Sequence, residues 1–474
     1  MVDPSLSSPS AEQSSRTDEI ARWLGVRAEP ALAPALLRVA VVSAILISPE
    51  LWQAPRWAAL PSSLQYLPEG LGWARQLVPI DPAVARCAQL VLIACSVFAL
   101  AGVMTRTALA LLTLSSLYVF GLAQLSGAVI HDMHLLWFCA LLALSPCGDA
   151  LSLQHGLRER RWILGLSRGA GEALAYGFAP HFTRMSLALV YFFPGFWKLA
   201  SSGFAWIAGD NLRNQLYWKW YQLGGLPLLR IDRVPALLNL AALAVVVFEL
   251  GFVSLIWSRR GRLLAAVSGA LFHLSVRWFM GVSFISLLMC YVVLLDWRAL
   301  AARLSRAADG GELGALPRSS GLALVVGACL VASVGVQGVR HAVQAWPFGC
   351  YPTFDQILGD EIVDLRIEAV GSDGTTRAIP DGPSTGGRRR TAQDWARAWQ
   401  LAGLYGTPAD LRQLQAYTDY LRADENIVAI LRTAHTLRFY AATYSVLPER
   451  WGEPPLRKHL LFEWSLPSGA APMP

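Results

Sequence analysis

The sequence is poor in charged residues, and among its cations it is very poor in lysine. Only 15% of the 474 residues are charged, whereas 54% are hydrophobic. Soluble globular domains contain about 25% charged and about 45–50% apolar residues, so this composition indicates an integral membrane protein instead. The 40 lysines and arginines include only three lysines, Lys198, Lys219 and Lys458. Arginine is the ordinary cation of this chain, and each lysine therefore needs its own explanation.

Motifs for disulfides, metals and secretion are also lacking. The seven cysteines form no CxxC pair and lie mostly within apolar runs, which argues against a disulfide scaffold or a zinc site. The spacings HExxH and HxxxH do not occur, and we predict no metal. Residues 1–29 are polar and Ser-rich and lack the order of a cleaved signal peptide. We predict that they form a disordered cytoplasmic tail.

Nine apolar runs have about the length that a helix needs to cross a bilayer. A helix crosses about 30 Å of hydrocarbon with about 20 residues. The fourth and eighth runs are the shortest. The runs are 31–48, 86–104, 107–126, 130–146, 183–200, 235–257, 262–279, 281–297 and 321–339. We therefore predict an all-α polytopic membrane helical bundle of about nine spans over residues 30–342.

Arginines cluster in every second loop of this bundle, after the second, fourth, sixth and eighth runs. The positive-inside rule places such loops in the cytoplasm. We predict a multi-pass protein of the cell membrane with a cytoplasmic N-terminus and an extracytoplasmic C-terminal part. Orientation also explains the net charge of +7, so we predict no nucleic-acid partner.

The connection 201–234 does not follow this pattern. It should be external, yet it carries four cations among aromatic residues, Arg213, Lys219, Arg230 and Arg233. Such a mixture of aromatic and cationic side chains is typical of a segment that lies in the membrane interface.

Residues 343–474 have the composition of a small soluble α+β domain. Apolar and polar residues alternate over 363–369 before the turn GSDG, which predicts a hairpin. Two amphipathic patterns, 392–405 and 408–424, predict helices. The stretches TLRFYAATYSV and HLLFEWSL predict two further strands.

Lys198 ends the apolar, aromatic stretch LVYFFPGFWKL near the outer end of the fifth run. A lysine near a helix end can snorkel, which lifts its ammonium to the membrane interface. However, a buried lysine can lose its proton, whereas the guanidinium of arginine stays charged. In this arginine-rich chain, Lys198 is therefore either an interfacial anchor or a buried general base or Schiff-base nucleophile.

Other ionisable residues fall at the same predicted depth. His131, Asp132 and His134 lie at the start of the fourth run, and His273 lies in the outer half of the seventh. Arg277 follows four residues later, on the same predicted helical face. Each histidine has the alternative interpretation of a packing residue with satisfied hydrogen bonds. Together with the lysine, these groups predict a proton-handling pocket beneath the outer surface.

At these residues the sequence resembles the HTTM (horizontally transferred transmembrane) domain family of vitamin K-dependent gamma-glutamyl carboxylases. The resemblance covers roughly residues 30–355 and is specific only in the combination of its motifs. The matching stretches are YFFPGFWKL with the following Trp206 and Gly209, HDMHLLWFCALLALSPCGDALSL, FHLSVRWFMGVSF and WPFGCYPTF.

The resemblance implies an activity and a role for each motif. Lys198 matches the base that acts on reduced vitamin K, or a menaquinone-like quinone, and His131 and His273 match functional histidines. Oxygen then adds, and the strong base so formed removes a proton from a glutamate side chain of a protein or peptide. Carbon dioxide traps the carbanion as the quinone epoxide leaves. We assign to binding of the quinone the residues Asp132, His134, Trp206 and Arg277.

Not all of the family's activity can be transferred to this chain. The family's carboxylase uses a large lumenal part to hold a propeptide-bearing substrate, whereas the soluble region here is short. We therefore predict lysine-based oxygenation of a quinone-like lipid as the leading function, with glutamate carboxylation as a coupled step. Two alternatives lack catalysis. One is a transporter or lipid-binding module that uses the same polar residues for recognition, and the other is a structural membrane partner.

Overall fold

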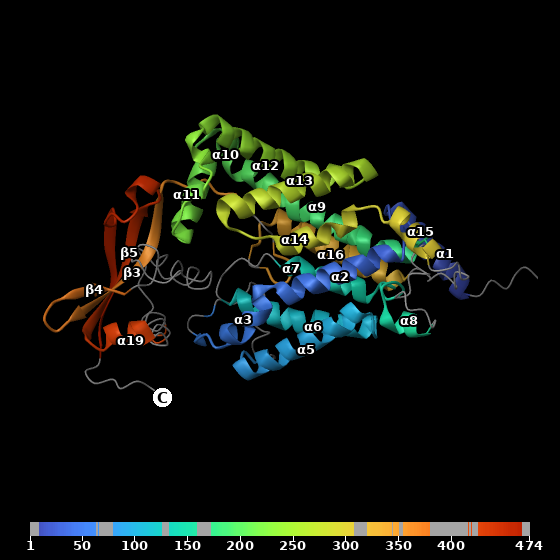
Figure 1. The fold of residues 1–474 in the computed structure, drawn as a ribbon, viewed down its shortest axis with the longest axis horizontal. Helices are drawn as coiled ribbons and strands as arrows, with labels where there is room; N and C mark the ends of the chain where they lie inside the picture. Colours follow the sequence, from blue (N-terminus) through green and yellow to red (C-terminus); the bar gives the residue numbers. More distant parts are fainter. Residues whose placement is uncertain are drawn as a thin grey trace, which may run out of the picture.

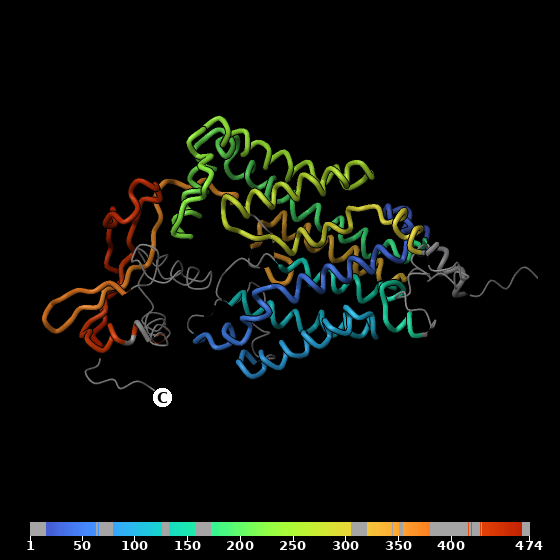
Figure 2. Tube along the Cα trace, viewed as in Figure 1, coloured from blue at the N-terminus to red at the C-terminus, as the bar shows by residue number. Residues whose placement is uncertain are grey.

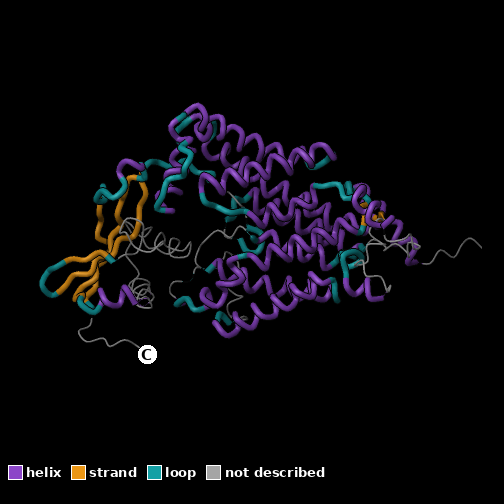
Figure 3. The backbone as a smooth tube through the Cα atoms, viewed as in Figure 1, coloured by secondary structure: helices purple, strands orange, loops and turns teal. Residues whose placement is uncertain are grey.

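The computed structural model describes residues 9–62, 65, 79–125, 132–158, 172–307, 320–343, 345–349, 354–379, 416, 419 and 425–466. These residues form a bundle of helices with a four-stranded sheet at one end (Figure 1). Among the described residues, every strand lies in the sheet except a small two-stranded pairing at the opposite end of the bundle (Figure 3).

The bundle contains the helices from α1 to α16 and the short strands β1 (Glu29–Pro30) and β2 (Glu172–Ala173). The helices are α1 (Pro9–Trp23), α2 (Leu32–Ile47), α3 (Pro49–Ala58), α5 (Pro82–Ala101), α6 (Thr105–Gln124), α7 (Met133–Ala143), α8 (Leu153–Arg158), α9 (Leu174–Ser202), α10 (Ala205–Ala208), α11 (Asn211–Leu223), α12 (Pro235–Leu255), α13 (Arg259–Met280), α14 (Ile285–Cys290), α15 (Arg298–Ala307) and α16 (Gly321–Val339). Residues 9–23, which the sequence predicts as part of a disordered tail, are thus helical.

Among the described residues, five helices are long and apolar enough to cross a membrane, or up to seven segments if each bent pair counts as one span. The five are α5, α6, α12, α13 and α16, which match five of the nine predicted runs. Helix α2 covers the first run, and α3, which begins directly after that run, is bent from α2 by 43°. The eighth bends by 77° before α15. The fourth run contains α7, which has only 11 residues.

Helix α9 lies at the centre of the bundle. It packs against α2, α7, α12 and α16, and most of its 29 residues are buried. It does not count among the apolar spans because it carries polar residues, including buried Arg184 and Lys198. Arg184 is paired with Glu29 at 3.4 Å and donates to the Val293 carbonyl at 3.1 Å. The buried charge of Arg184 is therefore matched to partners from two neighbouring segments.

Arginines that follow the sixth and eighth runs form ion pairs at one end of the bundle. Arg298 at the start of α15 contacts Glu172 at 2.9 Å, and Arg259 at the start of α13 contacts Asp296 at 3.1 Å. The trace in Figure 2 places α1, α8 and α15 at this end and the sheet at the other. Lys198, close to the end of α9, lies toward the sheet.

The C-terminal sheet is antiparallel, with the order β4-β3-β5-β6. Its strands match the strands that the sequence predicts. They are β3 (Glu361–Gly371), β4 (Thr376–Ala378), β5 (Ala434–Ser445) and β6 (Arg457–Ser465). The buried side of the sheet packs with α19 (Glu425–Leu431) around Leu437 and Phe439. The two helices predicted over 392–424 lie outside the described residues, except for 416 and 419.

Helix α11 connects the bundle to the sheet. Its aromatic residues Tyr217, Trp220 and Tyr221 are buried in one cluster with Tyr444 and Val446 from the sheet side. The sequence predicts that this segment lies in the membrane interface. In the structure its aromatic face packs against protein, so the same side chains serve to join the two parts.

Candidate functional site

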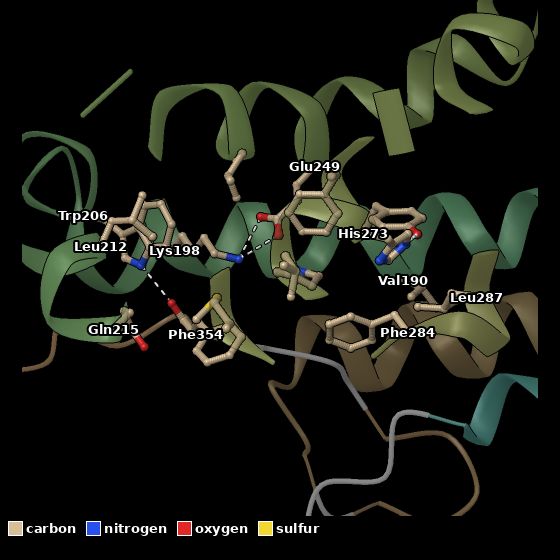
Figure 4. Close-up of a pocket in the computed structure, with 16 residues that line it drawn as sticks. Val190, Lys198, Trp206, Leu212, Gln215, Glu249, His273, Phe284, Leu287 and Phe354 are labelled. Carbon is tan, nitrogen blue, oxygen red and sulfur yellow. Dashed lines mark hydrogen bonds and ion pairs between the residues drawn. The ribbon is translucent and has the colours of Figure 1, made fainter. Parts of the chain in front are cut away.

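A cavity lies beside the sheet-facing half of α9. The centre of a water molecule can move in a volume of about 80 Å³. One water needs about 10–15 Å³ by this measure, so several waters or a flat aromatic ring would fit. The lining is aliphatic and aromatic with a few polar groups (Figure 4). It consists of Val190, Tyr191, Pro194, Lys198, Trp206, Leu212, Gln215, Val245, Glu249, Phe272, His273, Val276, Met280, Phe284, Leu287 and Phe354.

A buried ion pair is the main polar feature of this cavity. The Lys198 ammonium lies 2.8 Å from both carboxylate oxygens of Glu249, which comes from α12. The side chains are only 3% and 6% exposed. Lys198 Nζ also lies 5.3 Å from the centre of the Trp206 ring, within the range of a cation–π contact. A lysine that is buried and paired in this way does not snorkel to an interface.

Glycine lets the two helices of this ion pair approach each other. A Cβ added at Gly195 of α9 would lie 2.8 Å from the Cβ of Glu249, closer than two side chains tolerate. Gly195 stands three residues before Lys198, so the two share one face of the helix. The stretch PGFWK therefore brings the lysine and the glutamate together by removing the side chain between them.

A second polar group is a chain of three side chains, Tyr191 of α9, His273 of α13 and Tyr291, which directly follows α14. The Tyr191 hydroxyl lies 2.5 Å from Nε2 of His273 and 2.6 Å from the Tyr291 hydroxyl. His273 and Tyr191 line the cavity, and Tyr291 lies behind them. A Cβ at Gly269 would collide with the Tyr291 ring. This glycine, one turn before His273, gives the Tyr291 phenol its place.

The sheet-facing end of the cavity is lined by residues of α10, of α11 and of the segment that leads to the sheet. Trp206 of α10 donates from Nε1 to the Phe354 carbonyl at 2.8 Å, and both rings line the cavity (Figure 4). Gln215 of α11 donates to the Gln356 carbonyl at 2.9 Å. The backbone of Phe354 has a φ of 61°, which is uncommon for a residue with a side chain. The segment that leads to the sheet thus forms part of the site.

The structure brings together some of the residues that the sequence selects. Lys198, Trp206 and His273 line the cavity. Asp132 does not line it and accepts a hydrogen bond from Ser286. His134 is buried beside Phe138, with the ring centroids 5.4 Å apart, and does not line it either. His131 lies outside the described residues.

Arg277 does not share the cavity with His273, and this part of the prediction is wrong. Its side chain is exposed and donates to the Gly281 carbonyl at 3.3 Å. Four residues advance a helix by more than one full turn, because a turn has about 3.6 residues. On α13 that excess is enough to move position 277 from the cavity to the outer surface.

Sequence reasoning missed Glu249, Tyr191 and Tyr291. Glu249 had a clear signal, since it is the only acidic residue in the apolar run 235–257. An ionisable residue within a span marks a functional site by default. Tyr191 stands within a motif of the family resemblance but carries no charge. Tyr291 gave no signal, because its role depends on the fold.

Comparisons with protein-family models, with curated proteins and with solved structures find no match. The geometry of the cavity is therefore the basis for its interpretation. Among the described residues, no group of three or more histidine, cysteine, aspartate or glutamate side chains is arranged to hold a metal ion. The available chemistry is that of a buried amine, a carboxylate, an imidazole and two phenols.

Proposed function

We propose that this protein is a membrane enzyme of the HTTM type, in which Lys198 acts as a base on a quinone-like lipid that is then oxygenated. The observation that carries the proposal is the Lys198–Glu249 pair, which is buried from solvent and lines an apolar, aromatic cavity. Keeping two ionised groups out of water is costly, and removing either one alone is more costly still. Such groups within a membrane bundle generally serve function.

The pair can supply a base without adding net charge to the cavity. An ammonium cannot accept a proton, so Lys198 first gives one to Glu249: an N–H bond breaks and an O–H bond forms. Both forms of the pair are neutral overall. A dry aromatic ring that displaces water from the cavity favours the form without separated charges. The free amine then accepts the proton of a ring hydroxyl, whose O–H bond breaks as a new N–H bond forms.

The cavity walls suit the ring of such a lipid. Phe272, Phe284 and Phe354 offer aromatic surfaces, and Val190 and Val245 add aliphatic ones. Ligand sites in proteins are usually apolar with a small number of placed polar groups. A reduced quinone, either vitamin K or a menaquinone, offers a flat apolar ring with hydroxyl groups, which matches both parts of this lining. Its isoprenoid tail would extend toward the membrane lipid.

The remaining components of the proposal follow the family resemblance. Oxygen is the co-substrate of quinone oxygenation. Carbon dioxide and a protein or peptide glutamate are the co-substrates of the coupled carboxylation. We also propose nine membrane crossings, with α7, α9 and the bent pairs included, in the cell membrane. The N-terminus is then cytoplasmic and the sheet extracytoplasmic, which the separation of the arginine-rich end from the sheet supports.

The direct test supplies the purified protein in lipid nanodiscs with reduced menaquinone, oxygen and bicarbonate. Quinone epoxide is the expected product, detected by mass spectrometry and absent from empty nanodiscs. Incorporation of labelled carbon dioxide into an added glutamyl peptide tests the carboxylation separately. Binding of the quinone without any product would contradict the enzyme and favour the lipid-binding alternative.

The topology has its own test. Tags placed at the C-terminus and within 300–318 are expected to label from opposite sides of the membrane, because α15 and the sheet lie at opposite ends of the bundle. Impermeant labelling of intact cells and of inverted vesicles measures this. Labelling of both tags from the same side would refute the orientation.

A further inference from the structure

His273 lines the cavity and has one buried nitrogen that is unpaired within the part of the chain that the structure describes. The residue is 5% exposed and lines the cavity. Its Nε2 is engaged by Tyr191, but its buried Nδ1 has no hydrogen-bond partner among the described residues. Buried polar atoms are rarely left unpaired, because the loss of their hydrogen bonds to water is unfavourable. Because His273 lines the cavity, a hydrogen-bonding group on an occupant of the cavity is a candidate partner for this nitrogen.

The two tyrosines determine what this nitrogen offers. A neutral imidazole has one N–H donor and one acceptor nitrogen, and a phenol hydroxyl both donates and accepts. If Tyr191 donates to His273 Nε2, then Nδ1 carries the proton and is a donor. If Nε2 carries the proton and donates to Tyr191, whose hydroxyl in turn donates to Tyr291, then Nδ1 is an acceptor. Both arrangements keep the distances of 2.5 Å and 2.6 Å along the chain.

We infer that Tyr191 and Tyr291 are positioning residues that set the tautomer of His273, so that its Nδ1 binds a second oxygen of the ring as donor or as acceptor. This inference rests on the proposed function, because it takes the occupant to be a quinone-like ring. It adds that the substrate carries two ring oxygens. One faces Lys198 and Glu249, and the other faces His273.

The chemistry of a quinone and its reduced form requires such a switch. A quinone carbonyl only accepts hydrogen bonds, whereas a hydroquinone hydroxyl can donate one. A fixed donor would leave the hydroxyl proton of the reduced ring unpaired, and a fixed acceptor could not bind the carbonyl. Figure 4 shows Glu249 between Lys198 and His273 along the cavity, so a ring in it can present one oxygen to each group. The tyrosine chain lets one site hold both oxidation states.

The test compares three naphthalene-type compounds that differ only in the number of their ring oxygens or in the oxidation state of the ring. They are 2,3-dimethyl-1,4-naphthoquinone, its diol kept under anaerobic conditions, and 2,3-dimethyl-1-naphthol, which has one oxygen. The methyl groups block addition to the exposed thiols Cys87 and Cys329. Equilibrium dialysis against protein-loaded and empty nanodiscs measures the affinities. The diol is expected to bind wild-type protein about tenfold more tightly than the one-oxygen naphthol, as one satisfied buried hydrogen bond predicts.

Two substitutions separate recognition from packing. In His273→Phe, which keeps a ring, the tenfold preference for the diol over the naphthol should disappear, so that the two compounds bind with about equal affinity. In Tyr291→Phe, Tyr191 has only His273 left to donate to, so Nδ1 stays a donor. The affinity for the quinone should then change by less than about twofold while that for the diol falls about fivefold or more. Arg277 is exposed on the same helix as His273, and Arg277→Gln should change none of the three affinities.

The outcomes distinguish this inference from the proposed function. If wild-type protein shows no preference for the second oxygen, or if Tyr291→Phe weakens quinone and diol equally, the inference is overturned. If His273→Phe does not fold, Tyr291→Phe alone decides the matter. If the binding pattern is found but no epoxide forms, recognition of the second ring oxygen is supported and the proposed enzyme activity is rejected. If epoxide forms but the binding pattern is absent, the activity is supported and the recognition is rejected.

Discussion

Lys198→Arg is expected to lose quinone turnover as completely as Lys198→Ala does. Arginine keeps a cation of similar reach beside Glu249, but a guanidinium cannot become a free base under physiological conditions. General-base catalysis contributes about 10²- to 10⁴-fold to a rate, so both variants should fall by that order. The measurement is epoxide formation per folded protein in nanodiscs.

The control for this comparison is another of the three lysines. Lys458 belongs to β6 and contacts Glu368 at 2.6 Å in the sheet, away from the cavity lining. Lys458→Arg should keep wild-type activity. Retained turnover in Lys198→Arg, together with loss in Lys198→Ala, would mean that the site needs only a positive charge. In that case Lys198 is an electrostatic group, and the base mechanism is excluded.

The second large effect concerns the stability of the ion pair. Glu249→Ala should lower the free energy of unfolding by about 3–5 kcal/mol, because it leaves a buried ammonium without its partner. The double variant Lys198→Met with Glu249→Leu should cost much less than Glu249→Ala, since replacing a whole buried pair with apolar side chains is often nearly neutral. Reversible unfolding in mixed micelles would give these values.

An exposed pair provides the reference for this measurement. Arg438 and Glu463 join neighbouring strands at 2.7 Å and are 38% and 46% exposed. Glu463→Gln should cost no more than about 1 kcal/mol, as is typical of solvent-exposed pairs. If the double variant in the cavity proves as unstable as Glu249→Ala, the cost comes from lost packing and not from an unpaired charge.

Local patterns in the sequence predicted the elements of the fold better than their shapes. Hydropathy predicted the five long apolar helices, and alternation predicted the strands of the sheet. The break between α2 and α3 occurs at Pro49, and a proline there is compatible with either a bend or a new helix start. The length of α7 was overestimated because apolar residues continue past Ala143 into a turn.

The site was predictable only in its individual members. A motif can select Lys198, but whether its ammonium faces lipid or protein depends on the rotation of α9 within the bundle. Glu249 is 51 positions away along the chain, and no local pattern pairs residues at that distance. The Tyr191–His273–Tyr291 chain joins three separate segments. One sequence carries composition and periodicity, whereas such pairings arise from packing.

The hydrogen bond between Trp206 and Phe354 changes how the chain should be divided. The sequence suggested a border at residue 343, with the bundle before it and an independent soluble domain after it. Phe354 lies beyond that border but covers the cavity that holds Lys198. A protein shortened at 342 would keep every ionisable group of the site and lose its lid on the sheet side. Water would then reach the amine and the carboxylate, and the dry surroundings on which their proton exchange depends would be gone.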